Sequence, residues 1–276
     1  MRNEEREDQL KDMDFMTLFE NCRMCPRECG VNRLRNDNAG RAGFCGEGHE
    51  LKVAYVGPHF GEEPPITGER GSGTVFFTGC SLKCTYCQNH QISREGLGRA
   101  MDGAGLFDAV AGMIRKDRVH NVNLVSPDHF FPHAFELVAR LRAAGFGLPV
   151  VFNLSGYQSV SMLRLAEPYA DIYLPDYKYA DPALSLRYSK CRHYPEAALN
   201  AISEMVRQKG FQGVIVRHLI LPGHMDNSLN ALTGLFLEFG ARLALSLMTQ
   251  YFPATPQGPA SMNRPVTREE FDRVYA

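Results

Sequence analysis

The chain has 276 residues, of which 44% are hydrophobic and 22% are charged, and its formal net charge is −1. These values are close to globular averages, so they exclude a disordered or fibrous protein, and the near-neutral charge argues against a chain-wide contact with nucleic acid. No run of about 18 apolar residues occurs, and residues 1–14 are highly charged where a signal peptide would need an apolar segment. We therefore expect a cytoplasmic protein with no membrane segment.

The cysteines are concentrated at the start of the chain. Seven of the eight precede residue 88, and Cys191 stands alone. In a protein without an export signal, thiols are better explained as metal ligands or reactive groups than as disulfides, because the cytosol keeps them reduced. The pattern predicts metal chemistry in the N-terminal third and no such role for Cys191.

Residues 1–50 are predicted to form a small separate segment. Residues 4–20 have the pattern of a short amphipathic helix. A four-cysteine motif with C-x2-C-x3-C-x15-C spacing follows, made by Cys22, Cys25, Cys29 and Cys45. Four thiols can surround one ion or one cluster, and sulfur ligation leaves zinc and iron–sulfur both open. Nearby arginines are expected to offset the thiolate charge, a zinc-ribbon contact with nucleic acid being the alternative; they are Arg23, Arg27, Arg33, Arg35 and Arg41.

A second thiol motif follows an apolar, β-type run. Residues 74–90 read TVFFTGCSLKCTYCQNH, with Cys80, Cys84 and Cys87 spaced C-x3-C-x2-C. A structural zinc site closes with four protein ligands, whereas a cubic iron–sulfur cluster on three thiolates leaves one iron open to a small molecule. The motif favours the cluster, and a zinc knuckle completed by His90 is the alternative.

After this motif, strand and helix patterns alternate. With the run at 74–78, strands are predicted near 121–125, 149–153, 171–175, 213–221 and 243–247, and helices near 105–117, 132–144, 158–167, 195–209 and 227–239. A short strand at 51–56 precedes them, and Thr267 with Glu270 forms a potential capping box for a final helix. Six β-α units predict an α/β protein with parallel strands, either a doubly wound sheet or a barrel.

Four stretches together resemble one enzyme family. They are HFGEEPPITGERGSGTVFFTGCSLKCTYCQNHQIS, NVNLVSPDHFFP, DIYLPDYKYADP and VRHLILPGHMDNS. From about residue 20 onward the chain resembles radical S-adenosylmethionine (SAM) enzymes of the pyruvate formate-lyase activating enzyme-like branch. The resemblance implies a partial (β/α)6 barrel over residues 51–276. It also implies a 4Fe-4S cluster on the second thiol motif, whose open iron binds SAM, and a flavodoxin or ferredoxin as reductant.

The ends of parallel strands are where ligands bind in such folds, so the residues there are the candidate SAM contacts. In the resembling enzymes an aromatic residue before the last cysteine lies beside the adenine, and an Asp-x-Lys pair and a strand arginine contact SAM. The chain departs from the family's glycine-rich acidic motif after the second strand, and it has a glutamine where a histidine is frequent. The candidates are Tyr86, Ser126, Asp128, Asn153, Ser155, Asp176, Lys178, Arg217 and Gln250.

Two further groups have weaker assignments. His59, Glu62 and Glu63 lie in a loop before the first core strand and are candidates for substrate contacts, because binding residues concentrate on loops. His129 and His133 are four residues apart, but Pro132 intervenes, so we expect packed or pocket histidines and not a metalloprotease helix.

The function implied by the resemblance is reductive cleavage of SAM to a 5′-deoxyadenosyl radical that abstracts hydrogen, in an oxygen-sensitive, anaerobic oxidoreductase. The resemblance suggests a glycyl residue of a partner enzyme as the substrate. The alternatives are modification of a small molecule or peptide with the N-terminal site as an auxiliary cluster, a zinc and nucleic-acid binding module, and an iron–sulfur electron carrier.

Overall fold

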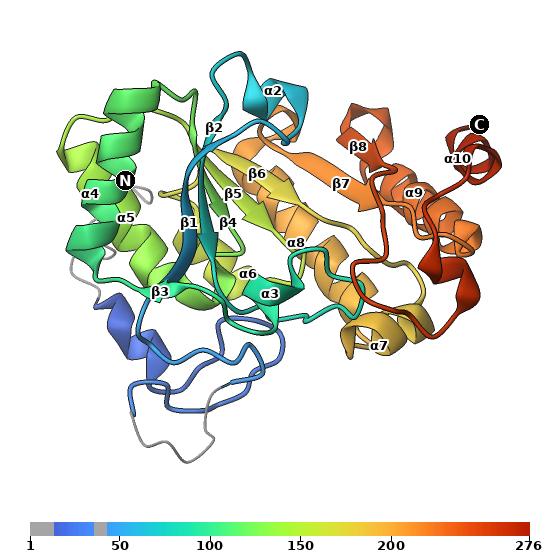
Figure 1. Ribbon diagram of the computed structural model, residues 1–276, viewed down its shortest axis with the longest axis horizontal. Helices are drawn as coiled ribbons and strands as arrows, with labels where there is room; N and C mark the ends of the chain where they lie inside the picture. Colours follow the sequence, from blue (N-terminus) through green and yellow to red (C-terminus); the bar gives the residue numbers. More distant parts are fainter. Residues whose placement is uncertain (1–13, 36–42) are drawn as a thin grey trace.

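The computed structural model describes residues 14–35 and 43–276, and within them six strands form one sheet in the order β3-β1-β2-β4-β5-β6 (Figure 1). A separate pair, β7-β8, continues beside it. The strands are Lys52–His59 (β1), Ser72–Phe77 (β2), Arg99–Ala100 (β3), Val122–Val125 (β4), Val150–Leu154 (β5), Ile172–Pro175 (β6), Ile215–Leu219 (β7) and Ala244–Met248 (β8).

The core of the sheet is parallel. β2 pairs with β4, β4 with β5 and β5 with β6, all parallel and in register, whereas β1 runs antiparallel to both β2 and β3. All five residues of β5 are buried, as expected for a strand covered on both faces. The predicted strands near 74–78, 121–125, 149–153 and 171–175 are confirmed within two residues. The short strand predicted at 51–56 is also present, but it is the antiparallel neighbour of β2.

The remaining two predicted strands form the β7-β8 pair, which is parallel throughout. Isolated parallel bridges join Tyr173 to Val214 and Asp176 to Arg217, so β7 follows β6 without a continuous ladder. The chain therefore has an α/β fold with a mostly parallel sheet, and its parallel strands β2, β4, β5 and β6 end on one common side.

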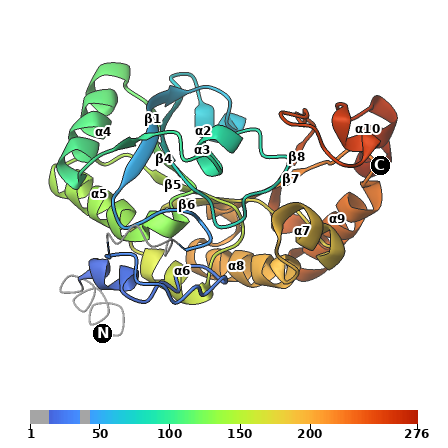
Figure 2. The same ribbon diagram turned by 60° about the horizontal axis from the view of Figure 1, so that its bottom comes forward.

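The longer helices lie along one face of the sheet, and α2 and α3 lie on the other (Figure 2). Six of them match the predicted helices, whereas α2, α3 and α7 were not predicted. The helices are Pro64–Thr67 (α2), His90–Ser93 (α3), Gly103–Asp117 (α4), Phe131–Ala143 (α5), Val160–Ala166 (α6), Pro182–Ser189 (α7), Tyr194–Lys209 (α8), Met225–Phe239 (α9) and Arg268–Tyr275 (α10). No helix among the described residues is long and apolar enough to cross a membrane.

Side-chain caps fix several helix starts. Asp102 accepts a hydrogen bond from Gly105 N (2.7 Å) at α4, and Asp181 accepts one from Ala183 N (2.7 Å) at α7. At α10, Thr267 and Glu270 form the predicted capping box, each accepting a hydrogen bond from the other's backbone N–H.

The N-terminal segment lies below the sheet, next to the ends of β2 and β4 (Figure 1). Of the helix predicted at 4–20, Phe15–Phe19 forms a 3-10 helix (η1) capped by Asp14, and residues 4–13 lie outside the described residues, as does Arg41. Arg27 joins this segment to the body: its guanidinium donates to the carbonyl oxygens of Ser81 (3.0 Å), Ser189 (2.8 Å) and Lys190 (2.6 Å). The segment is thus tied to both the second thiol motif and α7.

Candidate active site

The second thiol motif forms a tight loop directly after β2. Gly79 has φ +76°, and a Cβ at this position would lie 2.5 Å from Glu47 Cγ, so both its conformation and its surroundings require glycine. Lys83 also has a positive φ of 51°, which is uncommon for a residue with a side chain. The turn places Cys80, Cys84 and Cys87 around one volume.

Each thiol of this loop has a polar neighbour. Leu82 N donates to Cys80 Sγ (3.3 Å), Ser93 Oγ donates to Cys87 Sγ (3.2 Å), and Cys84 Sγ lies 3.0 Å from Ser189 Oγ. Burial raises the pKa of Cys80 to about 12, and it raises the pKa of Cys84 although the charge of Lys178 opposes the shift. The free thiols of Cys80 and Cys84 are therefore protonated at neutral pH, and binding of a metal centre would release their protons.

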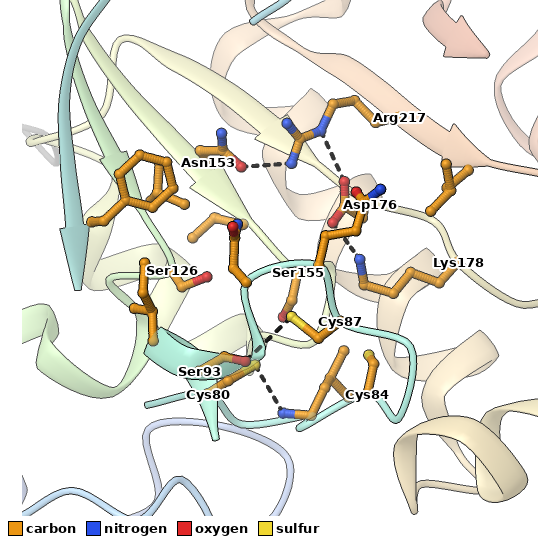
Figure 3. A pocket seen from close by; sticks show the side chains of 18 of the residues that line it. Cys80, Cys84, Cys87, Ser93, Ser126, Asn153, Ser155, Asp176, Lys178 and Arg217 are labelled. Atoms are coloured by element: carbon orange, nitrogen blue, oxygen red, sulfur yellow. Dashed lines mark hydrogen bonds and ion pairs between the residues drawn. The ribbon is translucent and has the colours of Figure 1, made fainter. Parts of the chain in front are cut away.

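The thiols open into a cavity of about 270 Å³ at the ends of the parallel strands (Figure 3). Cys80, Cys84 and Cys87 lie at one end in this view, and Arg217 lies at the other. Ligand sites in α/β folds typically lie at the carboxyl ends of parallel strands, where this cavity is found. Its lining includes the residues predicted to contact a cofactor: Tyr86, Ser126, Asn153, Ser155, Asp176, Lys178, Arg217 and Gln250.

A buried charge network occupies the far end of the cavity. Arg217 Nε donates to Asp176 Oδ1 (2.8 Å), and its Nη2 donates to Asn153 Oδ1 (2.6 Å). Lys178 Nζ donates to the other oxygen of Asp176. Glu62 completes the network, since its carboxylate accepts from Arg217 Nη1 (3.3 Å) and from Asn153 Nδ2 (3.2 Å). Four elements that are distant in sequence therefore meet at one point.

The two carboxylates in this network titrate differently. Burial alone would raise the pKa of Asp176, but the charges of Arg217 and Lys178 outweigh it and hold the pKa below its usual value. Burial dominates at Glu62 and raises its pKa despite the neighbouring Arg217. Asp176 is thus the firmly ionised partner of both cations, and Glu62 is the group closer to neutrality.

Asp128 lies behind the cavity and is not among the residues that line it. Its Oδ2 accepts hydrogen bonds from Gln158 Nε2 (2.9 Å), Ser81 Oγ (3.3 Å) and Ser155 Oγ (3.4 Å). Burial raises the pKa of Asp128 to about 6. This residue therefore supports the thiol loop through Ser81. It is the one predicted SAM contact that does not line the cavity.

The loop with the predicted substrate residues does approach the site. Glu62 contacts Arg217 directly, and Glu63 Oε2 lies 4.0 Å from Arg217 Nη1. His59 ends β1 and its ring packs edge-on against Phe76, with the centroids 6.0 Å apart. None of the three lines the cavity itself, and their role in substrate binding stays a prediction.

Sequence reasoning missed the groups that support the thiols. Ser189, at the end of α7, contacts Cys84, and Tyr179 donates from its hydroxyl to that of Tyr86 (2.8 Å). The Asp181-Pro182 pair is a helix-start signal that could have revealed α7 and so placed Ser189. Ser93 lies six residues beyond Cys87, in a stretch with no pattern that would have marked it.

The four-cysteine segment surrounds a second, much smaller space. Cys22, Cys25, Cys29 and Cys45 line a cavity of about 10 Å³. It is also lined by Arg33, Phe44 and His129, the last of which comes from the body of the protein. Arg27 lies over the Phe44 ring, with its guanidinium carbon 3.7 Å from the centroid. In residues 14–35 and 43–276 no three His, Cys, Asp or Glu side chains are arranged to hold a single metal ion, and the metal here stays a prediction.

The radical SAM superfamily matches residues 74–235, more than half of the chain, and the chain belongs to this superfamily. Membership implies a 4Fe-4S cluster and cleavage of SAM. A curated relative, an uncharacterized protein of Methanocaldococcus jannaschii, is 28% identical over 266 residues, which cover 93% of this chain and 74% of the relative.

Among solved structures, methylornithine synthase (PylB) is similar in fold. The TM-score is 0.50 and the identity is 14%, over 71% of this chain and 58% of that enzyme. This likeness concerns the fold alone.

The residues around the larger cavity fit the two groups that the superfamily implies. Three thiols face one cavity, and its described lining contains no fourth cysteine and no histidine that would close the coordination of a cluster. The same lining carries the amide, hydroxyl, carboxylate and ammonium groups that a zwitterionic nucleoside such as SAM requires. The donor set is suited to a cluster with an open iron beside a polar ligand.

Proposed function

We propose that the chain is a glycyl-radical enzyme activase, which removes a hydrogen atom from a glycyl residue of a partner enzyme. The observation that supports this most is the cavity itself, where three thiols and the Asp176, Lys178 and Arg217 network share one lining. The Asp-x-Lys pair and the strand arginine resemble the SAM contacts of the activating enzymes.

Cys80, Cys84 and Cys87 would hold the 4Fe-4S cluster. The cluster would supply one-electron chemistry: with an electron from a flavodoxin or ferredoxin, the sulfonium C–S bond of SAM would break to give methionine and a 5′-deoxyadenosyl radical, which would take a hydrogen atom from the substrate to become 5′-deoxyadenosine. Lys178 would pair with the methionine carboxylate, and Tyr86, 6% exposed, would lie beside the adenine. Asp176 fixes Lys178 and Arg217 in place, so the cavity is organised before a ligand arrives.

Two structural proposals accompany this function. We take β2 and β4 to β8 to be the six strands of a partial barrel. The reason is that isolated parallel bridges join β7 to the β6 edge of the larger sheet, so that the two sheets follow one another. We also take the four-cysteine segment to bind a second metal, zinc or iron–sulfur, because its thiols line one enclosed space. Its position against the thiol loop is supported by the Arg27 contact with Ser81.

Modification of a small molecule or peptide is the second candidate. It is favoured by the Glu62 carboxylate, which has a raised pKa and contacts two residues of the cavity lining, Arg217 and Asn153, from just outside the cavity. A small substrate could be held there by hydrogen bonds, whereas a glycyl backbone offers no side chain to such a group.

The test is release of 5′-deoxyadenosine from SAM by anaerobically reconstituted protein with a strong reductant. The control is the triple variant Cys80→Ala, Cys84→Ala and Cys87→Ala. Release by the wild type alone is expected. A protein that carries the cluster but leaves SAM intact would instead be an iron–sulfur electron carrier.

The substrate is tested separately, by electron paramagnetic resonance after incubation with a glycyl-radical enzyme from the same source. A glycyl radical signal that requires both proteins and SAM is the expected result. If 5′-deoxyadenosine forms at an unchanged rate and no protein radical appears with any such partner, the small-molecule candidate takes precedence.

A further inference from the structure

The end of helix α7 carries a group of cations. Residues 182–195 contain Arg187, Lys190 and Arg192 but no Asp or Glu, and all three cations are exposed. We call these three residues the basic end of α7. The whole chain has a formal net charge of −1, so this stretch is a local surplus of positive charge. Such a surplus attracts negatively charged partners from a distance and speeds their encounter.

The surface beside the basic end of α7 also lacks carboxylates. The thiol loop, residues 80–87, contains Lys83 and no Asp or Glu. Residues 249–263 contain no charged side chain, and Gln257 of this stretch accepts a hydrogen bond from Thr85 Oγ1 (3.0 Å). In the part of the chain that the structure describes, none of these four cations forms an ion pair with a carboxylate. Their charge is therefore available to a partner.

The basic end of α7 lies directly against the thiol loop. Thr85 N donates to the carbonyl oxygen of Tyr188 (2.8 Å), and Ser189 Oγ lies 3.0 Å from Cys84 Sγ. Ser189 directly precedes Lys190 in the sequence. The cationic surface is therefore one residue away from a side chain that touches a cysteine, and it offers a short route from solvent to the thiols.

The reductant of the proposed function needs a route that the cavity does not offer. The cavity holds about 270 Å³, which is room for a small molecule and not for a protein. An electron-carrier protein therefore has to approach a cysteine from outside the cavity. Short-lived complexes between redox proteins bury little area and depend on complementary charge, so a cationic surface suits an acidic carrier.

We propose that the basic end of α7, with Lys83 of the thiol loop, is the docking surface of an acidic electron-carrier protein of the flavodoxin or ferredoxin class. In the docked complex the carrier gives up one electron, which the group held by the thiol loop gains, and no bond forms or breaks in this step. Ser189 is the contact through which the surface reaches Cys84. This inference rests on the proposed cluster and adds the place where its electron enters.

The first experiment locates the surface without using enzyme activity. Oxidised plant-type ferredoxin is mixed at low salt with the anaerobically reconstituted full chain, and a carbodiimide joins lysine amines to the carboxylates that touch them. Mass spectrometry should find ferredoxin carboxylates on Lys190 and Lys83 and none on Lys116, which is exposed near the end of α4. Cross-links that avoid Lys190 and Lys83 would overturn the proposal. So would cross-links that persist at about 1 M salt, where charges are screened within about 3 Å.

The second experiment measures affinity in a variant of the basic end of α7. The variant combines Arg187→Gln, Lys190→Gln and Arg192→Gln. Its dissociation constant for oxidised ferredoxin at low salt should rise at least about tenfold, because removal of interface charges slows the encounter. An unchanged dissociation constant would overturn the proposal.

The matched control removes the same charge at the end of α4, which lies far from α7 in both views (Figure 1 and Figure 2). It also ends in a left-handed cap, since Arg118 has φ 52° and Lys190 has φ 53°. The control combines Arg115→Gln, Lys116→Gln and Arg118→Gln, three exposed cations. We expect its affinity for ferredoxin to stay within about a factor of two, because distant exposed charges are screened. Equal weakening in both variants would show attraction by the whole chain and would overturn a local surface.

The choice of reductant separates this inference from the proposed function. Release of 5′-deoxyadenosine is measured with reduced ferredoxin and with reduced methyl viologen, a small cation that needs no docking surface. The α7 variant should lose at least about tenfold with ferredoxin and nothing with viologen. A loss of equal size with both reductants would mean that the helix end acts on the cluster, and would overturn docking.

Two further outcomes concern the wild type. Release with viologen but with neither ferredoxin nor flavodoxin would overturn the docking surface and leave the SAM chemistry standing. A protein that carries the cluster and releases nothing with any reductant would overturn the proposed function, while cross-linking and affinity still decide the docking surface.

Discussion

The two sets of cysteines in this protein differ in their surroundings, although both consist of the same side chain. Cys80, Cys84 and Cys87 open into a cavity of about 270 Å³ lined by polar groups, whereas the four-cysteine segment encloses about 10 Å³. Catalytic metal sites keep an open position, and structural ones are closed by protein. The surroundings, and not the thiols, therefore distinguish the group that has room for a ligand from the group that is enclosed.

Removal of one thiol from the open site should have the largest effect. In Cys84→Ala the cluster loses one of three ligands, and we expect SAM cleavage to fall by roughly 10³-fold or more, because groups that act as a unit fail together. The measurement is 5′-deoxyadenosine release per chain. The control is Cys191→Ala, a buried cysteine outside both groups, and equal loss in both variants would contradict the assignment of the open site.

The charged end of the open cavity should contribute most to stability. Arg217→Met removes the partner of Asp176 and Glu62 at a side chain that is 15% exposed, so two buried carboxylates lose a cation. We expect a loss of about 3–5 kcal/mol in the free energy of unfolding, measured by denaturant titration.

The matched control for Arg217 is Arg268→Met, because Arg268 also pairs with one carboxylate, that of Asp272, but its side chain is 80% exposed. No measurable change in the free energy of unfolding is expected there, because the pair is exposed to solvent. Similar losses in the two variants would mean that the cavity network is not buried in solution.

Gly79 lies where the two regions meet and tests their contact. In Gly79→Ala the new methyl meets Glu47 of the N-terminal segment, in addition to the strain of a positive φ, and we expect a loss of roughly 2–3 kcal/mol. Gly145→Ala has φ +81° but nothing within 4 Å of the new methyl, so about 1 kcal/mol is expected. The difference between the two losses measures the contact between the regions.

The ion pair between Arg264 and Glu270 lies apart from both sets of cysteines, and its effect on stability is the reference for the larger effects above. Hydrogen bonds from Arg264 hold the pKa of Glu270 at about 2, below its unfolded value near 4.3. This group therefore contributes stability that is present above about pH 4.3 and is lost as the pH falls toward 2. Because Arg264 is partly exposed, we expect Glu270→Gln to remove only about 1 kcal/mol at pH 7. Denaturant titrations at pH 7 and pH 3 should show a smaller acid loss in the variant than in the wild type.

Local patterns predicted the strands and the thiol loop because these depend on neighbouring residues. β-branched and aromatic residues mark β2, and Gly79 marks the turn after it. Because parallel strands end on one side of a sheet, Asn153, Asp176 and Arg217 were expected to share one site, and they do contact one another.

Contacts between residues that are far apart in the sequence could not be predicted in this way. The distance from Arg33 to His129, or from Cys84 to Ser189, depends on how segments about a hundred residues apart pack. Asp128 has the chemistry of a ligand-binding residue, but its three hydrogen-bond donors turn it away from the cavity lining. Such placements are decided by packing and not by residue type.

The contacts of the Arg27 guanidinium join two segments of the chain that are synthesised at different times. The guanidinium joins Ser81 to the end of α7, which leaves the ribosome about a hundred residues later. At about 5–20 residues per second, the thiol loop is made roughly 5–20 s before Ser189 can contact Cys84. We expect the nascent loop to be more open during this interval than in the finished fold, which makes it the natural moment for a cluster to be inserted.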